Sequence, residues 1–225
     1  MNKTIQFVDW GVLDYQQAWD KQEEIFSAQL EHKKKGEPTS NTLIFVEHPH
    51  VYTLGKSGDE HNLLIAENLL KRINATYYKV NRGGDITYHG PGQIVGYPIL
   101  DLEHFNIYLK EYIHKLEESI IRFLKLDYGI DSHRLEGATG VWLDEGPRQR
   151  KICAIGTKAS RYITMHGFAL NINTDLNYFN YINPCGFTDK GVTSIAKELG
   201  HEIDIEDAKR KLANRFAEVF EAEYV

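Results

Sequence analysis

The chain has 225 residues, of which 42% are hydrophobic and 26% charged, and its formal net charge is -6. These proportions are typical of a folded globular protein. The negative balance argues against a general nucleic-acid binder, because phosphate binding needs an excess of Lys and Arg. No stretch approaches the roughly 20 apolar residues of a membrane span, and acidic Asp9 stands where a signal peptide is apolar. We therefore expect a cytoplasmic protein that binds neither nucleic acid nor membrane.

Apolar spacing predicts one helix and several strands in the first half of the chain. Asp14 is placed to cap a helix that ends near Lys35 and turns one apolar side inward. Runs rich in β-branched and aromatic residues predict strands at residues 42–48, 76–82 and 94–102.

The second half predicts two more helices and a group of strands. A helical stripe of apolar residues follows residue 106 and ends at Gly129. Residues 140–144, the polar turn 145–150 and the alternating run 151–173 predict a hairpin that continues into a third strand. Asp204 starts a terminal amphipathic helix. Because no linker divides these elements, we expect a single α/β domain, residues 1–225, with a mixed sheet flanked by helices.

The segment RGGDITYHGPGQ, residues 82–93, places four glycines between two predicted strands. Such a density of glycine costs conformational entropy, which favours a segment where a ligand comes close to the backbone. A glycine-rich hairpin connection is the alternative. The segment contains neither GxxxxGK[ST] nor GxGxxG, so a nucleotide-binding loop has little support.

The two cysteines differ in their surroundings. In YINPCGF, Cys185 stands between a proline and a glycine, which predicts a turn that directs the thiol; an inert turn cysteine is equally compatible. Cys153 has apolar flanks that favour a packed core thiol. On a regular strand it would share a face with Lys151, two residues earlier. A lysine near a cysteine stabilises the thiolate, although a lysine at a strand end is often simply solvated.

The histidines His89 and His166, together with a cysteine, raise the alternatives of a metal site or a Cys-His hydrolase. The chain has no CxxC, HxxxH or HExxH spacing, so we expect no metal. A histidine on a strand, as predicted for His166, is more often structural than catalytic.

Five segments occur together in one order: EHPHVYTLGK (47–56), RGGDITYHGPGQ, KICAIG (151–156), HGFALN (166–171) and NPCG (183–186). In this order and spacing the chain resembles the bacterial lipoyl(octanoyl) transferase family from about Leu43 to Ile195. The resemblance implies the mixed-sheet fold of the biotin and lipoate protein ligases. It also implies ATP-independent transfer of octanoyl from octanoyl-acyl carrier protein to lipoyl domains of 2-oxoacid dehydrogenases or the glycine cleavage H protein, with no cofactor.

The resemblance also implies roles for individual residues. Cys185 matches the nucleophile that forms the acyl-thioester, and Lys151 matches the lysine that lowers its pKa. The segments that match the substrate-binding segments comprise Arg82, Gly83, Gly84, Asp85, Ile86, Thr87, Tyr88, His89, Ala154, Ile155, Gly156, Gly167, Phe168 and Ala169. At Cys153 the chain departs from the family, in which alanine is common.

Other functions use the same fold or the same pair of residues. An ATP-dependent lipoate or biotin protein ligase would need a nucleotide, whereas a thioester donor is already activated and needs only a nucleophile. An amidotransferase that moves octanoyl or lipoyl groups between carrier proteins would differ in its donor. A non-catalytic module that binds acyl carrier protein would need neither Lys151 nor Cys185.

Overall fold

A computed structural model describes residues 3–183 and 190–225. Within these ranges a nine-stranded mixed sheet has the order β12-β1-β2-β6-β10-β9-β8-β7, with β11 paired to β9. Its strands are β1 (Thr4–Val12), β2 (Thr42–Glu47), β6 (Gln93–Ile99), β7 (His133–Leu135), β8 (Ala138–Leu143), β9 (Arg150–Ser160), β10 (Ile163–Asn171), β11 (Gly191–Val192) and β12 (Glu223–Tyr224). A smaller sheet of order β4-β3-β5 is formed by β3 (Val51–Leu54), β4 (Thr76–Lys79) and β5 (Ile86–His89).

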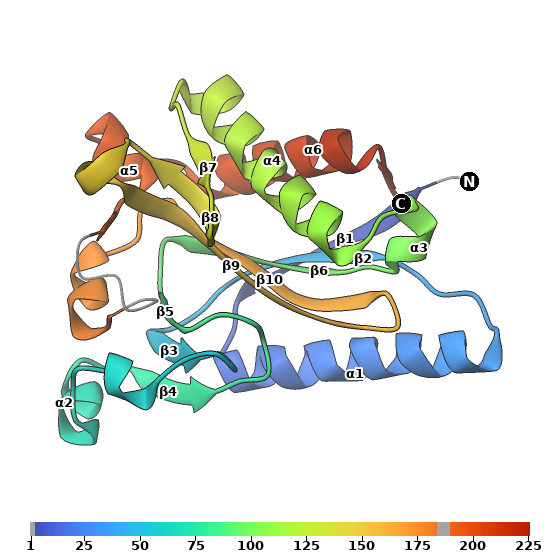
Figure 1. Ribbon diagram of the computed structural model, residues 1–225, viewed down its shortest axis with the longest axis horizontal. Helices are drawn as coiled ribbons and strands as arrows, with labels where there is room; N and C mark the ends of the chain where they lie inside the picture. Colours follow the sequence, from blue (N-terminus) through green and yellow to red (C-terminus); the bar gives the residue numbers. More distant parts are fainter. Residues whose placement is uncertain (1–2, 184–189) are drawn as a thin grey trace.

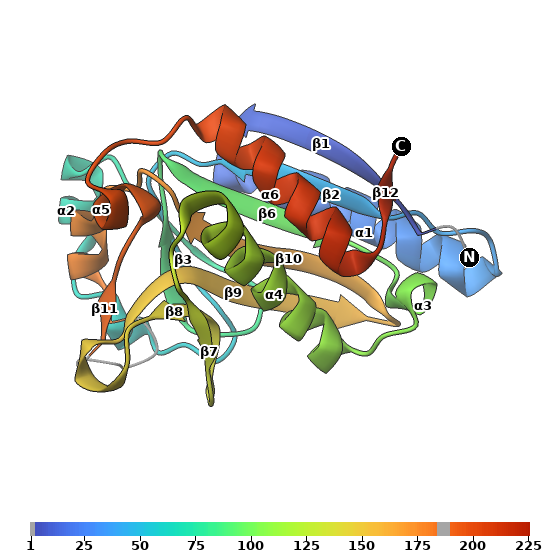
Figure 2. The same ribbon diagram turned by 90° about the horizontal axis from the view of Figure 1, so that it is seen from above.

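The helices cover both faces of the large sheet. In Figure 1, α4 and α6 lie on one face, while α1 and the small sheet lie on the other. Figure 2, seen from above, shows α4 and α6 side by side across the strands. The α-helices are α1 (Tyr15–Lys35), α2 (Glu67–Arg72), α3 (Leu102–Phe105), α4 (Leu109–Tyr128), α5 (Ile195–Leu199) and α6 (Ile205–Phe220), and the 3-10 helices are η1 (Glu60–Asn62), η2 (Gly146–Arg148) and η3 (Leu176–Tyr181).

Each long helix begins or ends at a residue with the expected capping chemistry. The Asp14 carboxylate accepts hydrogen bonds from the backbone N–H groups of Gln16 and Gln17 at the start of α1. Asp204 caps α6 in the same way. Gly129 ends α4 with a φ of 68°, a left-handed conformation that glycine adopts without a steric penalty. The three predicted long helices are therefore confirmed, although α4 begins at Leu109, because Asn106 ends the preceding short helix α3.

The predicted strands agree less completely with the structure. The strands near 42–48 and 94–102 and the three antiparallel strands around residues 140–173 are confirmed. The strand predicted at 76–82 ends at Lys79, so Arg82 lies in a bend. The strands β1, β3, β5, β7, β11 and β12 were not predicted. All of them except β1 are only two to four residues long, and β5 falls inside the glycine-rich segment.

Two apolar cores hold the layers together. Phe45, Phe168 and Leu170 of the sheet pack with Leu116, Phe123 and Phe216 in the core beneath α4 and α6. On the other face, Val95 and Ala169 pack with Ala18 and Phe26 of α1. Among the described residues, no helix is long and apolar enough to cross a membrane.

Candidate active site

A cavity of about 350 Å³ lies between the glycine-rich segment and the large sheet, on the face that carries α1. Most of the residues that the family resemblance suggested for substrate binding line this cavity. They are Arg82, Gly84, Asp85, Ile86, Thr87, His89, Ala154, Ile155, Gly156, Gly167, Phe168 and Ala169. Lys151 lines it as well. The fold thus brings residues from β5, β9 and β10 to one concave surface.

The glycines let the segment lie directly on strand β9. The Gly83 N–H donates to the Thr157 carbonyl at 2.9 Å. A Cβ at Gly156 would lie 2.7 Å from the Gly83 oxygen, and Gly84 has a φ of 84°. The glycines were expected to let a ligand come close to the backbone. At Gly83 and Gly156 they instead let the glycine-rich segment come close to strand β9.

Arg82 lines the cavity, and hydrogen bonds hold its guanidinium group in place. One guanidinium nitrogen donates to the Thr53 carbonyl at 2.6 Å and to the Thr53 hydroxyl at 2.8 Å, and the other donates to the Gly83 carbonyl. The side chain is buried. This geometry joins the glycine-rich segment to β3 of the small sheet.

His89 is a neutral hydrogen-bond donor. The Gln93 amide donates to the Tyr88 carbonyl and to the Asn171 Oδ1, so its Oε1 accepts from His89 Nδ1 at 2.8 Å. The ring stacks on Tyr15 at a centroid distance of 5.9 Å. Burial, with a further contribution from His48, holds the pKa of His89 well below its usual value. The residue supports the cavity wall without carrying a charge.

Tyr88 and Gly83 do not line the cavity, unlike the other residues of segment 82–89. The Tyr88 ring stacks on Tyr178 of η3 at 5.0 Å, and its hydroxyl lies 2.7 Å from Nδ1 of His50. A Cβ at Gly90 would lie 1.9 Å from the Tyr88 hydroxyl, which explains the glycine there. Tyr88 thus packs η3 against the small sheet.

Lys151 and Cys153 do not share a face, contrary to the expectation from strand alternation. Trp142 pairs with Lys151 and Val141 pairs with Cys153, and the register shifts between these two pairs. Lys151 lines the cavity, with its ammonium 4.6 Å from the centre of the Trp142 ring. Cys153 instead lies in the core beneath α4 and α6, where burial raises the pKa of its thiol. Cys153 is therefore a packed core thiol.

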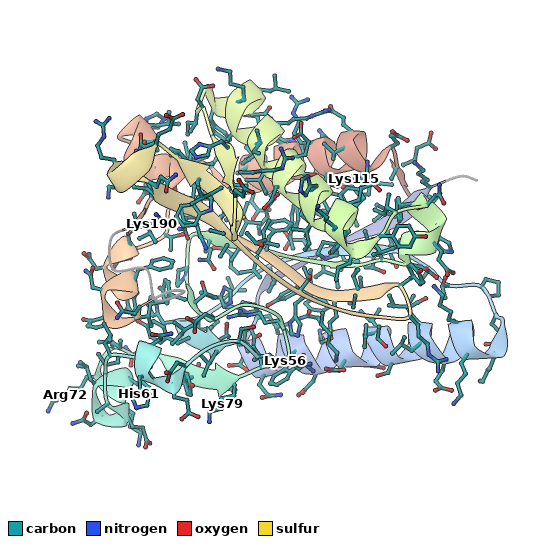
Figure 3. The ribbon with its side chains drawn as sticks, in the orientation of Figure 1. Lys56, His61, Arg72, Lys79, Lys115 and Lys190 are labelled. Carbon is teal, nitrogen blue, oxygen red and sulfur yellow. The ribbon has the colours of Figure 1, made fainter. Side chains whose placement is uncertain are left out.

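Cys185 lies outside the described residues, but the chain on both sides of it is anchored. The Asn183 N–H donates to the Asn62 carbonyl at 2.8 Å. On the other side, Gly191 and Val192 of β11 pair with Arg150 and Lys151. Lys190, labelled in Figure 3, donates to the Gln149 side chain beside the turn between β8 and β9. The chain that follows Cys185 thus returns to the strand that carries Lys151.

Several residues of the cavity gave no signal in the sequence analysis. Tyr15, Tyr97 and Trp142 line the cavity from α1, β6 and β8. Each sits in an ordinary apolar pattern. Strand pairing brings Tyr97 and Trp142 to the site, and the packing of α1 against the sheets brings Tyr15. In the ranges that the structure describes, no group of three or more His, Cys, Asp or Glu side chains could hold a metal ion.

The model of the lipoyl protein ligase A/B catalytic domain matches residues 14–217. An octanoyltransferase of Bacteroides fragilis is 58% identical over 205 residues, which cover 91% of this chain and 92% of the relative. An octanoyltransferase of Flavobacterium johnsoniae is 56% identical over 233 residues and covers all of both chains.

This chain belongs to the lipoyl protein ligase A/B catalytic domain family. Among its curated relatives it groups with the octanoyltransferases, so it is a transferase that acts in protein lipoylation by octanoyl transfer. ATP-independent transfer fits these relatives better than it fits the ligases.

Solved structures agree with the fold of this family. A lipoate-protein ligase A bound with ATP has a TM-score of 0.70 at 12% identity, covering 100% of this chain and 90% of that one. A biotin protein ligase from Aquifex aeolicus, in complex with biotin and ATP, has a TM-score of 0.52 at 13% identity, with 97% and 71% covered. The expected biotin and lipoate ligase fold is confirmed.

We expect this protein to lose stability in acid, because two of its histidines are buried in the neutral form. Burial lowers the pKa of His48 to about 4 and that of His166 to about 3, whereas an unfolded histidine titrates near 6.5. Below about pH 6.5 the unfolded chain binds more protons than the folded chain. The free energy of unfolding therefore decreases as the pH falls from 6.5 toward the folded-state pKa values of about 4 and 3. We expect the free energy of unfolding to drop by a few kcal/mol between pH 6.5 and 4.

Urea unfolding at several pH values measures this drop. His48 is the better probe, since its ring lies 2.7 Å from both the Leu13 carbonyl and the Tyr97 hydroxyl. The variant His48→Gln should show a shallower decline in acid. An equal slope in the variant and the wild type would show that another group causes the loss.

Proposed function

We propose that this chain takes the octanoyl group from octanoyl-acyl carrier protein, holds it as a thioester on Cys185, and passes it to a lysine of a lipoyl domain. The acceptors are the lipoyl domains of 2-oxoacid dehydrogenases and the glycine cleavage H protein, and residues 1–225 act as one catalytic domain. The observation that carries the proposal is the pairing of Gly191 and Val192, six and seven residues after Cys185, with Arg150 and Lys151 at the cavity. The proposal is supported by Lys151 at an acyl-sized cavity and by a chain that pairs with this lysine seven residues after Cys185.

The first step forms a thioester on the protein. The Cys185 thiolate attacks the thioester carbonyl, the new C–S bond forms, and the C–S bond to the carrier breaks. The departing carrier thiolate takes a proton from the Lys151 ammonium. Lys151 beside the thiolate lowers the pKa of Cys185 before the attack. One thioester replaces another, so the acyl group stays activated.

The second step moves the acyl group to the acceptor. A lysine amine with a reference pKa near 10.4 is almost fully protonated at neutral pH. The acceptor therefore first releases one proton to water, and the neutral amine attacks the thioester; Lys151, left neutral by the first step, takes the second proton from the attacking nitrogen. The C–N bond forms, the C–S bond breaks, and the Cys185 thiolate is restored beside a cationic Lys151.

The cavity supplies the binding energy for the acyl chain. Val95, Ala154 and Ala169 form its middle wall. Burial of a methylene contributes about 0.8 kcal/mol, so an eight-carbon chain gains several kcal/mol from such a wall. Lys151 lies at the end where the thioester carbonyl would sit.

Intact mass spectrometry tests the proposal directly. The protein is mixed with octanoyl-acyl carrier protein, without ATP and without acceptor, as wild type, Cys185→Ser and Cys153→Ser. We expect a hydroxylamine-labile octanoyl adduct in the wild type and in Cys153→Ser, but not in Cys185→Ser. Because Cys153 is buried in the core, its replacement is a matched control for the loss of one thiol. An adduct that persists in Cys185→Ser, or forms only with ATP, would contradict the proposal.

A further inference from the structure

Trp142 of β8 lies directly beside Lys151 of β9. The two residues pair across the strands, and the Lys151 ammonium lies 4.6 Å from the centre of the Trp142 ring. Both residues line the cavity. The face of an aromatic ring attracts a cation within about 6 Å of its centre, and tryptophan attracts it most strongly. The distance is therefore that of a cation-π contact.

A β-bulge produces this arrangement. Between the pairs Val141–Cys153 and Trp142–Lys151, β9 carries one additional residue, Ile152. Residues that pair directly point to the same side of a sheet. Val141 and Cys153 accordingly share the core beneath α4 and α6, while Trp142 and Lys151 share the cavity. In a regular ladder continued from Val141 and Cys153, Trp142 would pair with Ile152 instead.

Contacts within β8 and from α4 hold the bulge and the ring in place. The Gly140 N–H donates to a carboxylate oxygen of Glu117 in α4 at 3.1 Å. A Cβ at Gly140 would lie 2.5 Å from the Cys153 carbonyl oxygen, so only glycine allows β8 to approach β9 here. The Trp142 indole N–H donates to the Ala138 carbonyl at 2.9 Å, and Trp142 is buried. The ring thus keeps one orientation toward the cavity.

We infer that Trp142 is a positioning residue for Lys151: its ring holds the charged amine in place and favours the ammonium over the neutral amine. The inference rests on the proposed function, in which the ammonium stabilises the Cys185 thiolate and then gives a proton to the carrier thiolate. Lys151 is half-buried. A cation-π contact at such a site favours the ammonium by about fivefold to tenfold. Loss of the ring should therefore release more of the neutral amine at a given pH.

Two substitutions of similar size separate the ring from the space that it fills. Trp142→Phe and Trp142→Met both remove the indole N–H and both leave a gap, but only Phe keeps an aromatic face. A merely structural role of Trp142 would affect the two variants equally. Trp10→Met is the matched control, because Trp10 lies on β1, outside the cavity, with its ring 5.3 Å from the Lys21 ammonium.

Acetylation of Lys151 measures its ionisation without the donor. Each protein is treated briefly with acetic anhydride, which reacts with the neutral amine, at a series of pH values, and peptide mass spectrometry gives the acetylated fraction of each lysine. Every variant also carries Cys185→Ser, so no thiolate at this position contributes. The midpoint pH for Lys151 should be about 0.7 to 1 lower with Trp142→Met than with Trp142 intact. Lys158, on the same strand, is the internal reference.

The order of the midpoints decides the inference. A midpoint with Trp142→Met that is lower than both the midpoint with Trp142→Phe and that with Trp142 intact supports it. Every other order, equal midpoints in the Phe and Met variants included, overturns it. The Trp10→Met control should leave the Lys151 midpoint unchanged, and an equal shift in this control would also overturn the inference.

Octanoyl transfer tests the consequence for the reaction and is measured with Cys185 present. At saturating octanoyl-acyl carrier protein, Trp142→Met should transfer at least about fivefold more slowly than Trp142→Phe. If the wild type transfers no octanoyl, the proposed function fails, and acetylation alone decides about the ring. If the wild type transfers octanoyl and the two variants are equally fast, the reaction does not use the ring-held ammonium, and the inference is overturned.

Discussion

The variant Lys151→Arg is expected to lose octanoyl transfer by a factor of about 10² to 10⁴, the usual contribution of general acid and base catalysis. Arginine retains the positive charge at the cavity but does not release its proton near neutral pH. It therefore still favours a thiolate at Cys185, yet supplies no proton to the carrier thiolate and accepts none from the acceptor lysine. Turnover should fall far more than thiolate formation.

Two measurements on the same variant distinguish these roles. Steady-state transfer reports turnover, and the pH dependence of iodoacetamide labelling at Cys185 reports the pKa of its thiol. Lys158→Arg is the control, because Lys158 lies on the same strand but pairs with Glu23 outside the cavity. Wild-type turnover in Lys151→Arg would exclude Lys151 as the proton carrier.

The variant Gly156→Ala is expected to lower transfer by at least about a hundredfold. A Cβ at this position would lie 2.7 Å from the Gly83 oxygen and 3.2 Å from the Arg82 side chain. The contact with backbone cannot be relieved by a rotamer change, so the glycine-rich segment must move away from β9. Because that segment forms one wall of the cavity, a shift of about 1 Å would misplace the bound acyl group and slow the reaction by about this factor.

Gly83→Ala gives a graded comparison across the same contact. Its Cβ would meet the Thr157 oxygen at 3.3 Å, which a shift of a few tenths of an ångström relieves. We expect a smaller loss of transfer in Gly83→Ala than in Gly156→Ala, with both proteins folded by circular dichroism. Equal activities of the two variants would show that the segment does not hold the cavity wall.

Local chemistry made much of the fold predictable. The carboxylates of Asp14 and Asp204 cap their helices through hydrogen bonds within three residues, and Gly129 ends α4 through its own φ. Strand alternation and helical stripes likewise depend on neighbours along the chain. The order and spacing of five short segments were enough to indicate the family, because the residues that mark each segment lie next to one another in the sequence.

Strand register was the first property that only the tertiary structure decided. Alternation placed Lys151 and Cys153 on one face, but the register shift against β8 separates them. A register shift depends on the partner strand, which a local pattern does not contain. The position of Tyr88 also depends on a distant part of the chain. The family resemblance placed Tyr88 in a substrate-binding segment, but its ring packs on Tyr178, ninety residues later.

The composition of the cavity was the second such property. The sequence by itself determined which segments carry unusual chemistry: a glycine-rich segment, a lysine at the start of an apolar run, and a cysteine between a proline and a glycine. Only the tertiary structure brought Tyr15 of α1, Tyr97 of β6 and Trp142 of β8 to one cavity. Burial and hydrogen-bond satisfaction depend on contacts between residues far apart in the chain, so they are decided when the layers pack.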